Sequence, residues 1–217
     1  MTFAAGDFNS DGVPDLFALK HSNTGSGMLE VHILSGASNY QTFLLHIATP
    51  IGTADAAANM TFAVGDFNGD GIPDLFVFKK SNTGSGTLEV HVLDGATNYQ
   101  TFLLHIATPI GQADAATNFT FAVGDFNRDG VPDVFAFKHS KTGTGSLEVH
   151  VLSGAGNYQT FLLNTGTSIS QADAATNFSF ALGDFNRDTI PDVIGTKFSN
   201  TGTGNLEVHM LNGATNY

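Results

Sequence analysis

The chain has 217 residues, 41% of them hydrophobic, which is enough apolar material to bury a core. A formal net charge of −12 without any basic stripe argues against nucleic acid and anionic membranes as partners. No apolar run approaches the roughly 18 residues of a membrane-spanning helix. There is no cysteine, so disulfides cannot stabilise the fold.

One unit of about 59 residues recurs along the chain, and its second copy shows the pattern of predicted elements. Residues 61–67 are expected to form a short strand that enters a polar loop. Residues 75–78 are apolar at every position, which predicts a second strand covered on both faces. After a Gly- and Asn-rich connection at 81–86, residues 88–92 alternate strictly and predict a third strand.

The second half of the unit continues with a turn at residues 95–99 and a further alternating stretch, 100–106, which predicts a fourth strand. Residues 107–118 form a longer connection back to the next unit. Its Ala-rich segment, 113–116, is expected to hold one helical turn at most.

The polar loop between the first two strands carries oxygen ligands at regular spacing. In Asp66-Phe67-Asn68-Gly69-Asp70-Gly71-Ile72-Pro73-Asp74, side-chain oxygens occupy positions 1, 3, 5 and 9, and a backbone carbonyl is available at position 7. Such oxygens approach one Ca²⁺ ion at roughly 2.3–2.6 Å. The loop recurs at Asp7, Asp125 and Asp184, and the four copies hold 12 of the 20 acidic residues. We therefore expect up to four calcium ions, one per unit.

Four short antiparallel strands per unit, repeated with little helix, predict an all-β fold of the β-propeller type, with a stacked β-solenoid as the alternative. We expect one repeat domain, 1–217, with units 1–59, 60–118, 119–177 and an incomplete 178–217. The last unit lacks the fourth strand. Either one blade of a four-bladed propeller has three strands, or the chain is a fragment of a larger propeller that assembles with copies of itself through the open edge.

The segment Gly65-Asp66-Phe67-Asn68-Gly69-Asp70-Gly71-Ile72-Pro73-Asp74-Leu75 resembles the FG-GAP/VCBS repeat, the blade unit of integrin-α-type propellers. The resemblance covers all four units and implies Ca²⁺-binding loops in extracellular proteins of adhesive, lectin-like or enzyme-accessory type. Position by position, the implied calcium ligands are Asp7, Asn9, Asp11, Val13 and Asp15; Asp66, Asn68, Asp70, Ile72 and Asp74; Asp125, Asn127, Asp129, Val131 and Asp133; and Asp184, Asn186, Asp188, Ile190 and Asp192.

The fourth loop departs from the others because Thr189 stands where they have Gly12, Gly71 and Gly130. If this position needs a positive φ, a β-branched residue there costs on the order of 1 kcal/mol or more. We therefore expect the fourth loop to bind calcium most weakly.

Two further patterns recur outside the loops. An Asn-Tyr pair follows a turn in every unit, and an amide beside an aromatic ring is a candidate sugar site, the alternative being a tyrosine that caps the blade edge. The residues are Asn39, Tyr40, Asn98, Tyr99, Asn157, Tyr158, Asn216 and Tyr217.

The second pattern is Glu-x-His on the third strand, as in Glu89 and His91. It suits a transition metal or acid–base chemistry, but a site repeated four times favours a polar pair between neighbouring blades. His46 and His105 lie on the fourth strand, where the third unit has Asn164. This exchange indicates a hydrogen-bonding or solvent-facing place rather than a metal ligand.

These observations predict a calcium-stabilised, non-catalytic binding module that is secreted or displayed at the cell surface. Glycans are the first ligand class, followed by extracellular proteins. The alternatives are a spacer attached to a secreted hydrolase, and an excised or engineered repeat fragment that self-assembles. No signal peptide precedes Met1, and the chain begins in register with the second unit, so we expect a piece of a longer secreted protein.

Overall fold

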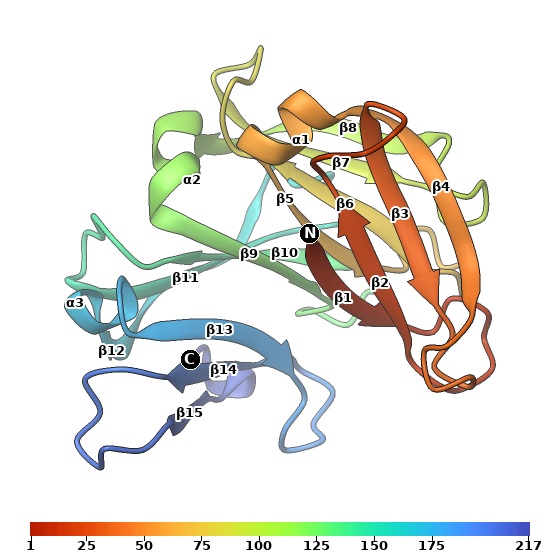
Figure 1. Ribbon diagram of the computed structural model, residues 1–217. Coiled ribbons are helices and arrows are strands. Elements are labelled where there is room, and N and C mark those ends of the chain that lie inside the picture. The colour runs from red at the N-terminus through yellow and green to blue at the C-terminus, as the bar shows by residue number, and fades with distance from the viewer. The chain divides into compact units, whose positions relative to one another are not determined.

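The computed structural model describes residues 1–217, which form four antiparallel sheets and little helix (Figure 1). Within each sheet the strands pair in chain order, so every sheet is a meander. The strands of one 59-residue repeat pair with each other and not with strands of the next repeat, which excludes a solenoid. The predicted fold class is confirmed: an all-β fold of four β-propeller blades, the last of which has three strands.

The chain divides into two compact units, Met1–Ala113 and Asp114–Tyr217, with two blades each. The elements of the first are β1 (Thr2–Gly6), β2 (Asp15–Lys20), β3 (Met28–Leu34), β4 (Phe43–Gly52), α1 (Thr53–Asn59), β5 (Met60–Gly65), β6 (Asp74–Lys79), β7 (Thr87–Leu93) and β8 (Phe102–Gly111). The helix α2 (Gln112–Asn118) follows. The second unit contains β9 (Phe119–Gly124), β10 (Asp133–Lys138), β11 (Ser146–Leu152), β12 (Phe161–Ser170), α3 (Gln171–Ala174), β13 (Phe178–Gly183), β14 (Asp192–Lys197), β15 (Glu207–Leu211) and a 3-10 turn, Gly213–Thr215.

Each unit has its own apolar core between its two blades, and the first strands of the two blades contact each other, β1 with β5 and β9 with β13. The second and third strands of the blades supply most of the core. Leu75, Phe76, Val77 and Phe78 in β6 are all at most 1% exposed, as the uninterrupted apolar run predicts. None of the helices has the length and apolarity needed to cross a bilayer.

Two local expectations are corrected. The fourth strand of the second blade extends to Gly111, because pairing between β7 and β8 resumes after a register shift between Thr87 and Glu89 and continues past the alternating residues. The connection after it holds more than one helical turn. This helix, α2, has seven residues, and Asn118 Nδ2 donates to Asp114 Oδ1 at 2.6 Å, which links residues one turn apart.

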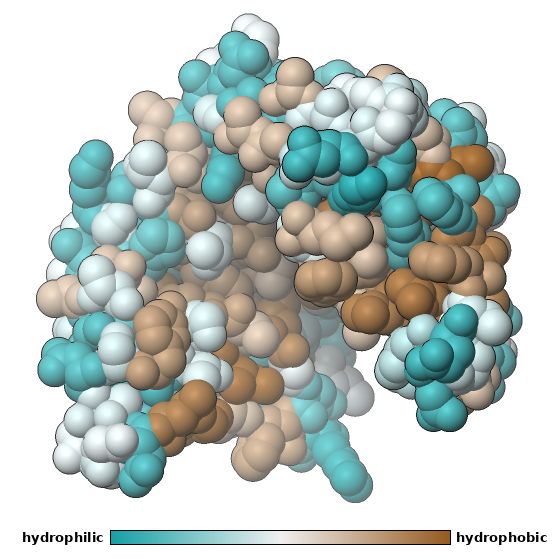
Figure 2. Space-filling view, in the orientation of Figure 1, coloured by the Kyte–Doolittle hydropathy of each residue, from teal (hydrophilic) through white to brown (hydrophobic).

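The fourth blade ends at β15, which pairs only with β14. Val208 in β15 is 59% exposed, whereas Val31, Val90 and Val149, at the same register in the other blades, are fully buried. Leu206 is 61% exposed for the same reason. Hydrophobic side chains accordingly reach the surface over β15 and along β4 of the first blade (Figure 2).

Candidate metal sites

The loop between β5 and β6 is folded around its own side-chain oxygens. Asp66 accepts the backbone N–H groups of residues 69–71 at 2.8–3.1 Å, and Asn68 Oδ1 accepts the N–H of Asp70 at 3.0 Å. Asp70 in turn accepts the N–H of Ile72 at 2.8 Å. These bonds hold the first, third and fifth side chains on the exposed side of the loop. They leave further lone pairs free, because each carboxylate oxygen has two.

The ninth residue, Asp74, lies beneath the loop and is fully buried. Its Oδ2 accepts the N–H of Phe67 at 2.8 Å, and its Oδ1 accepts the N–H of Gly95 at 2.8 Å. Asp74 thereby joins the loop to the turn after the third strand. Burial raises the pKa of Asp74 to about 6, against the lowering effect of these two N–H groups, and the charge of Asp70 raises it further.

All four loops share this arrangement. The ninth residue accepts the N–H of the second loop residue at 2.8–3.0 Å and that of a glycine in the later turn at 2.8–2.9 Å. The pairs of donors are Phe8 and Gly36 for Asp15, Phe67 and Gly95 for Asp74, Phe126 and Gly154 for Asp133, and Phe185 and Gly213 for Asp192. Burial likewise raises the pKa of Asp133 to about 6.

The predicted calcium ligands are therefore neighbours, but the carboxylates of a loop do not all lie within 4.8 Å of one another. They are directed toward amide N–H groups of the loop instead. The donor set nevertheless fits Ca²⁺, since every candidate ligand is an oxygen and hard cations take six to eight of them. The residues that would hold the ion in the second loop are Asp66, Asn68, Asp70 and Asp74, with the carbonyl of Ile72.

The position occupied by Thr189 does require a left-handed backbone. Thr189 has φ +72°, close to the +82°, +85° and +86° of Gly12, Gly71 and Gly130. Its N–H donates to Asp184 Oδ2 at 2.9 Å, so the backbone cannot rotate away without breaking a loop bond. A Cβ at any of the three glycines would meet nothing within 4 Å. The strain is therefore confined to the backbone of Thr189.

In the second and third blades, the Asn-Tyr turns do not form the sugar sites that the sequence suggested. Tyr99 and Tyr158 are fully buried, and their hydroxyls donate to the carbonyls of Pro73 and Pro132 at 2.9 Å. Both residues of each pair have positive φ, 55° and 61° at Asn98 and Tyr99, and both tyrosines lie in the apolar core, Tyr99 beside Phe8 of the first blade. Their rings therefore offer no free face to a ligand. Tyr40 in the first blade is 47% exposed, so its ring does have a face open to a ligand.

The structure also joins residues that the sequence left apart. His91 in β7 and His105 in β8 are register partners, so that Glu89, His91 and His105 form a single group. The first blade repeats it with Glu30, His32 and His46. Alternation showed that Glu89 and His91 share a face of the strand, but it gave no register between β7 and β8. Only that register identifies His105 as the third member.

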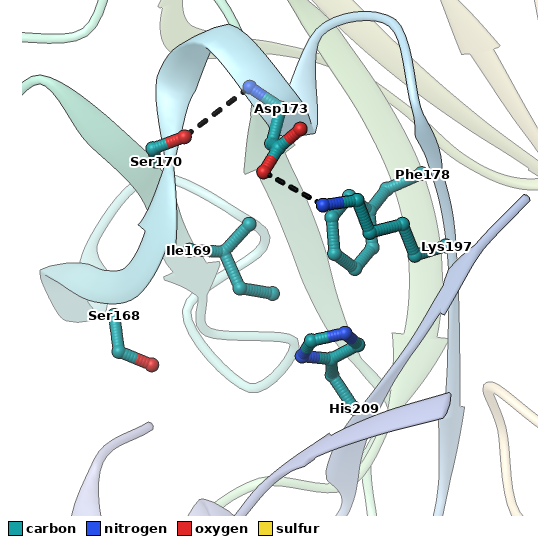
Figure 3. A pocket seen from close by; sticks show the side chains of 7 residues that line it. All are labelled: Ser168, Ile169, Ser170, Asp173, Phe178, Lys197 and His209. Atoms are coloured by element: carbon teal, nitrogen blue, oxygen red, sulfur yellow. Dashed lines mark hydrogen bonds and ion pairs between the residues drawn. The ribbon is translucent and has the colours of Figure 1, made fainter. Parts of the chain in front are cut away.

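In the fourth blade the corresponding region is an open pocket lined by Ile169, Asp173, Phe178, Lys197 and His209, with two serines (Figure 3). Lys197 Nζ lies 3.0 Å from Asp173 Oδ2 and also lies over the Phe178 ring. The side chain of His209 is 41% exposed, because no fourth strand covers β15. The pocket thus holds one satisfied ion pair and a single accessible histidine.

Comparison with known proteins agrees with the blade architecture. Residues 7–77 match the model of the FG-GAP-like repeat, a segment that runs from the first candidate calcium loop through the second. A search of curated proteins found no significant match to the chain. The chain therefore carries an FG-GAP-like repeat at residues 7–77, and the same loop and blade recur along it at intervals of 59 residues.

Proposed function

We propose that the chain is a calcium-stabilised β-propeller module of extracellular proteins that binds a ligand and catalyses no reaction. The observation that supports calcium most is the fourfold loop. In each copy a buried aspartate joins the loop to a distant turn, below the exposed oxygens of the first, third and fifth residues. A cation beside this group would favour the charged form of Asp74 and offset the cost of burying it.

Calcium that binds the folded chain but not the unfolded chain would stabilise the folded state by mass action. A site filled at 100 times its dissociation constant adds roughly 2.7 kcal/mol to the free energy of unfolding. The test is a thermal melt of the calcium-loaded protein and of a chelated sample, together with titration calorimetry. We expect the melting temperature to rise with calcium. The proposal fails if calcium produces neither heat nor a shift in melting temperature.

The structure offers a matched pair of variants for this test. Asp70→Asn removes one charge from the second loop and should weaken one calcium site. Asp94→Ser removes one charge from the following turn and copies Ser35 and Ser153, which occupy this position in the first and third blades. The control should keep the calcium stoichiometry of the unchanged protein. Equal losses in both variants would indicate a general charge effect instead of a ligand.

Glycans remain the first ligand class in this proposal, but the rings available for stacking differ from those of the Asn-Tyr turns. Phe43, Phe102 and Phe161 begin the outer strands of three blades and are 58%, 42% and 40% exposed, each beside an exposed leucine. Repeated shallow sites of this kind gain strength from multivalency. Calcium-loaded and chelated samples are to be screened on a glycan array, with Phe102→Ala as the test variant and Tyr99→Phe as the buried control.

Binding to one coherent sugar class, weakened by Phe102→Ala and retained by Tyr99→Phe, supports the proposal. A folded, calcium-loaded sample that binds no glycan on the array favours the spacer role. In that case calcium would serve the fold alone.

Self-association is a second candidate, because β15 has one unpaired edge and exposes Leu206 and Val208 beside it. An exposed apolar edge strand is a template for pairing with another chain. Light scattering across a concentration series should show oligomers that Val208→Lys dissociates. A monomer at every concentration contradicts this candidate.

A further inference from the structure

Each of the first two blades brings one carboxylate and two imidazoles together on its outer strands. In the second blade, one ligand atom from each of Glu89, His91 and His105 lies within 4.8 Å of the other two. The rings of His91 and His105 are stacked, with centroids 3.8 Å apart. In the first blade the rings of His32 and His46 are 4.0 Å apart. No other three His, Asp or Glu side chains of the chain are gathered in this way.

One nitrogen in the second blade has no hydrogen-bond partner. His91 is 6% exposed, and its Nε2 is buried without an acceptor or donor; the Glu89 Oε2 atom lies 3.5 Å away, too far for a well-formed bond. A neutral imidazole in this position is the form that binds a metal.

The carboxylate is held so that one oxygen stays available. Glu89 Oε1 accepts the hydroxyl of Ser85 at 2.8 Å and its N–H at 3.2 Å, so Oε2 faces the histidines. Lys79 does not occupy that oxygen, since its ammonium lies 2.7 Å from Asp55. Supporting bonds of this kind orient metal ligands and raise affinity.

The first blade is less favourable for a cation. Lys20 Nζ lies 3.8 Å from Glu30 Oε2, the oxygen that faces His32, and so places a positive charge at the group. Ser26 holds the other oxygen as Ser85 does in the second blade, at 2.8 Å. The two groups therefore have the same types of ligand and the same serine bond to the glutamate. They differ because only the first has a lysine ammonium beside the glutamate oxygen that faces the histidines.

We propose that Glu89, His91 and His105 bind a transition-metal dication of the Zn²⁺ type, and that Glu30, His32 and His46 form a second, weaker site. Two nitrogens and one carboxylate oxygen are donors that zinc accepts, and three protein ligands leave a fourth position for water. The donor set differs from the all-oxygen loops, which suit calcium. The exposed His105 gives the ion access from solvent. The proposal is independent of the calcium function.

The third blade supplies a natural control. His150 there pairs in register with Asn164, so the third ligand is missing although Glu148 and His150 are in place. His105→Asn therefore copies a residue that this fold already carries at that position, on an exposed site. Asn164→His makes the reverse change and creates a third Glu-His-His group.

The experiment titrates Zn²⁺ into the full, untagged chain in millimolar calcium, which keeps the loops saturated, with a competing chromophoric chelator. We expect two zinc ions per chain, one for His105→Asn and three for Asn164→His. Ser85→Ala should weaken the tighter site by about 10- to 100-fold. Cobalt(II) in place of zinc should give the intense visible absorption of a four-coordinate site, lost at the second blade in His105→Asn.

Zinc stoichiometry and affinity unchanged in His105→Asn would overturn the assignment, as would a folded Asn164→His chain that gains no site. Zinc that is displaced by calcium would belong to the loops and would overturn it equally. Circular dichroism of each variant shows that the fold is retained.

Discussion

Replacing Thr189 with glycine should stabilise the protein, against the usual effect of introducing a glycine. Thr189 sits at φ +72° and its N–H is fixed to Asp184 by a 2.9 Å bond. A left-handed backbone costs an L-residue roughly 1–2 kcal/mol, and the extra freedom that glycine has in the unfolded chain costs about 0.5–1 kcal/mol. The net gain in the free energy of unfolding is therefore about 1 kcal/mol, or roughly 2–4 °C in melting temperature for a chain of this size.

The reverse change tests the same reasoning in the neighbouring loop. Gly130 has φ +86°, its N–H donates to Asp125 at 2.9 Å, and a Cβ there would meet nothing within 4 Å. Gly130→Thr should therefore destabilise the chain by about 1 kcal/mol through the backbone alone. Both variants are to be measured by urea unfolding with and without calcium, and Thr189→Gly should also raise calcium affinity at the fourth loop. If neither variant changes stability, positive φ is not what distinguishes this loop.

The remaining predictions concern buried polar groups. Tyr99→Phe should lower the free energy of unfolding by about 1 kcal/mol, because the carbonyl of Pro73 loses its hydroxyl donor. Tyr99→Ala should lower it by about 3–5 kcal/mol, whereas Tyr40→Ala, at an exposed ring, should lower it by about 0.5 kcal/mol. Equal losses for Tyr99→Ala and Tyr40→Ala would refute the burial argument. Since burial raises the pKa of Asp74 and Asp133 to about 6, the calcium-free folded chain binds more protons than the unfolded chain between about pH 4 and pH 6. Its stability relative to Asp74→Asn should fall by up to about 3 kcal/mol as the pH rises through this window, measured by urea unfolding, and a difference that is constant with pH would contradict the shift.

The sequence predicted the features that depend on residue spacing. The apolar run at 75–78 indicated a strand covered on both faces, and Leu75 to Phe78 are indeed buried. The positions of the loops between the first and second strands followed from the spacing of Asp, Asn and Gly, because these residues tolerate the tight turn. Even the special backbone at Thr189 could be predicted, from glycine at the three equivalent positions.

The sequence could not predict which way a turn directs its side chains. Gly-Ala-Thr-Asn-Tyr indicated a turn correctly, but not the burial of Tyr99. Tyr40 has the same positive φ angles and is 47% exposed, whereas Tyr99 is buried because it packs in the core beside Phe8 of the first blade. Nor could the sequence place His105 beside His91. That pairing depends on a register shift between Val92 and Leu93, which alternation along one strand does not contain.

Equilibrium dialysis against calcium, with a count of ions bound per chain, shows directly whether the four loops bind calcium. We predict saturation at four ions per chain, with the fourth loop filling last in the unchanged protein and no longer lagging in Thr189→Gly. One ion fewer is expected for Asp70→Asn and no change for Asp94→Ser. A folded chain that binds no calcium would contradict the account, because the buried aspartates would then need no cation to close the loops.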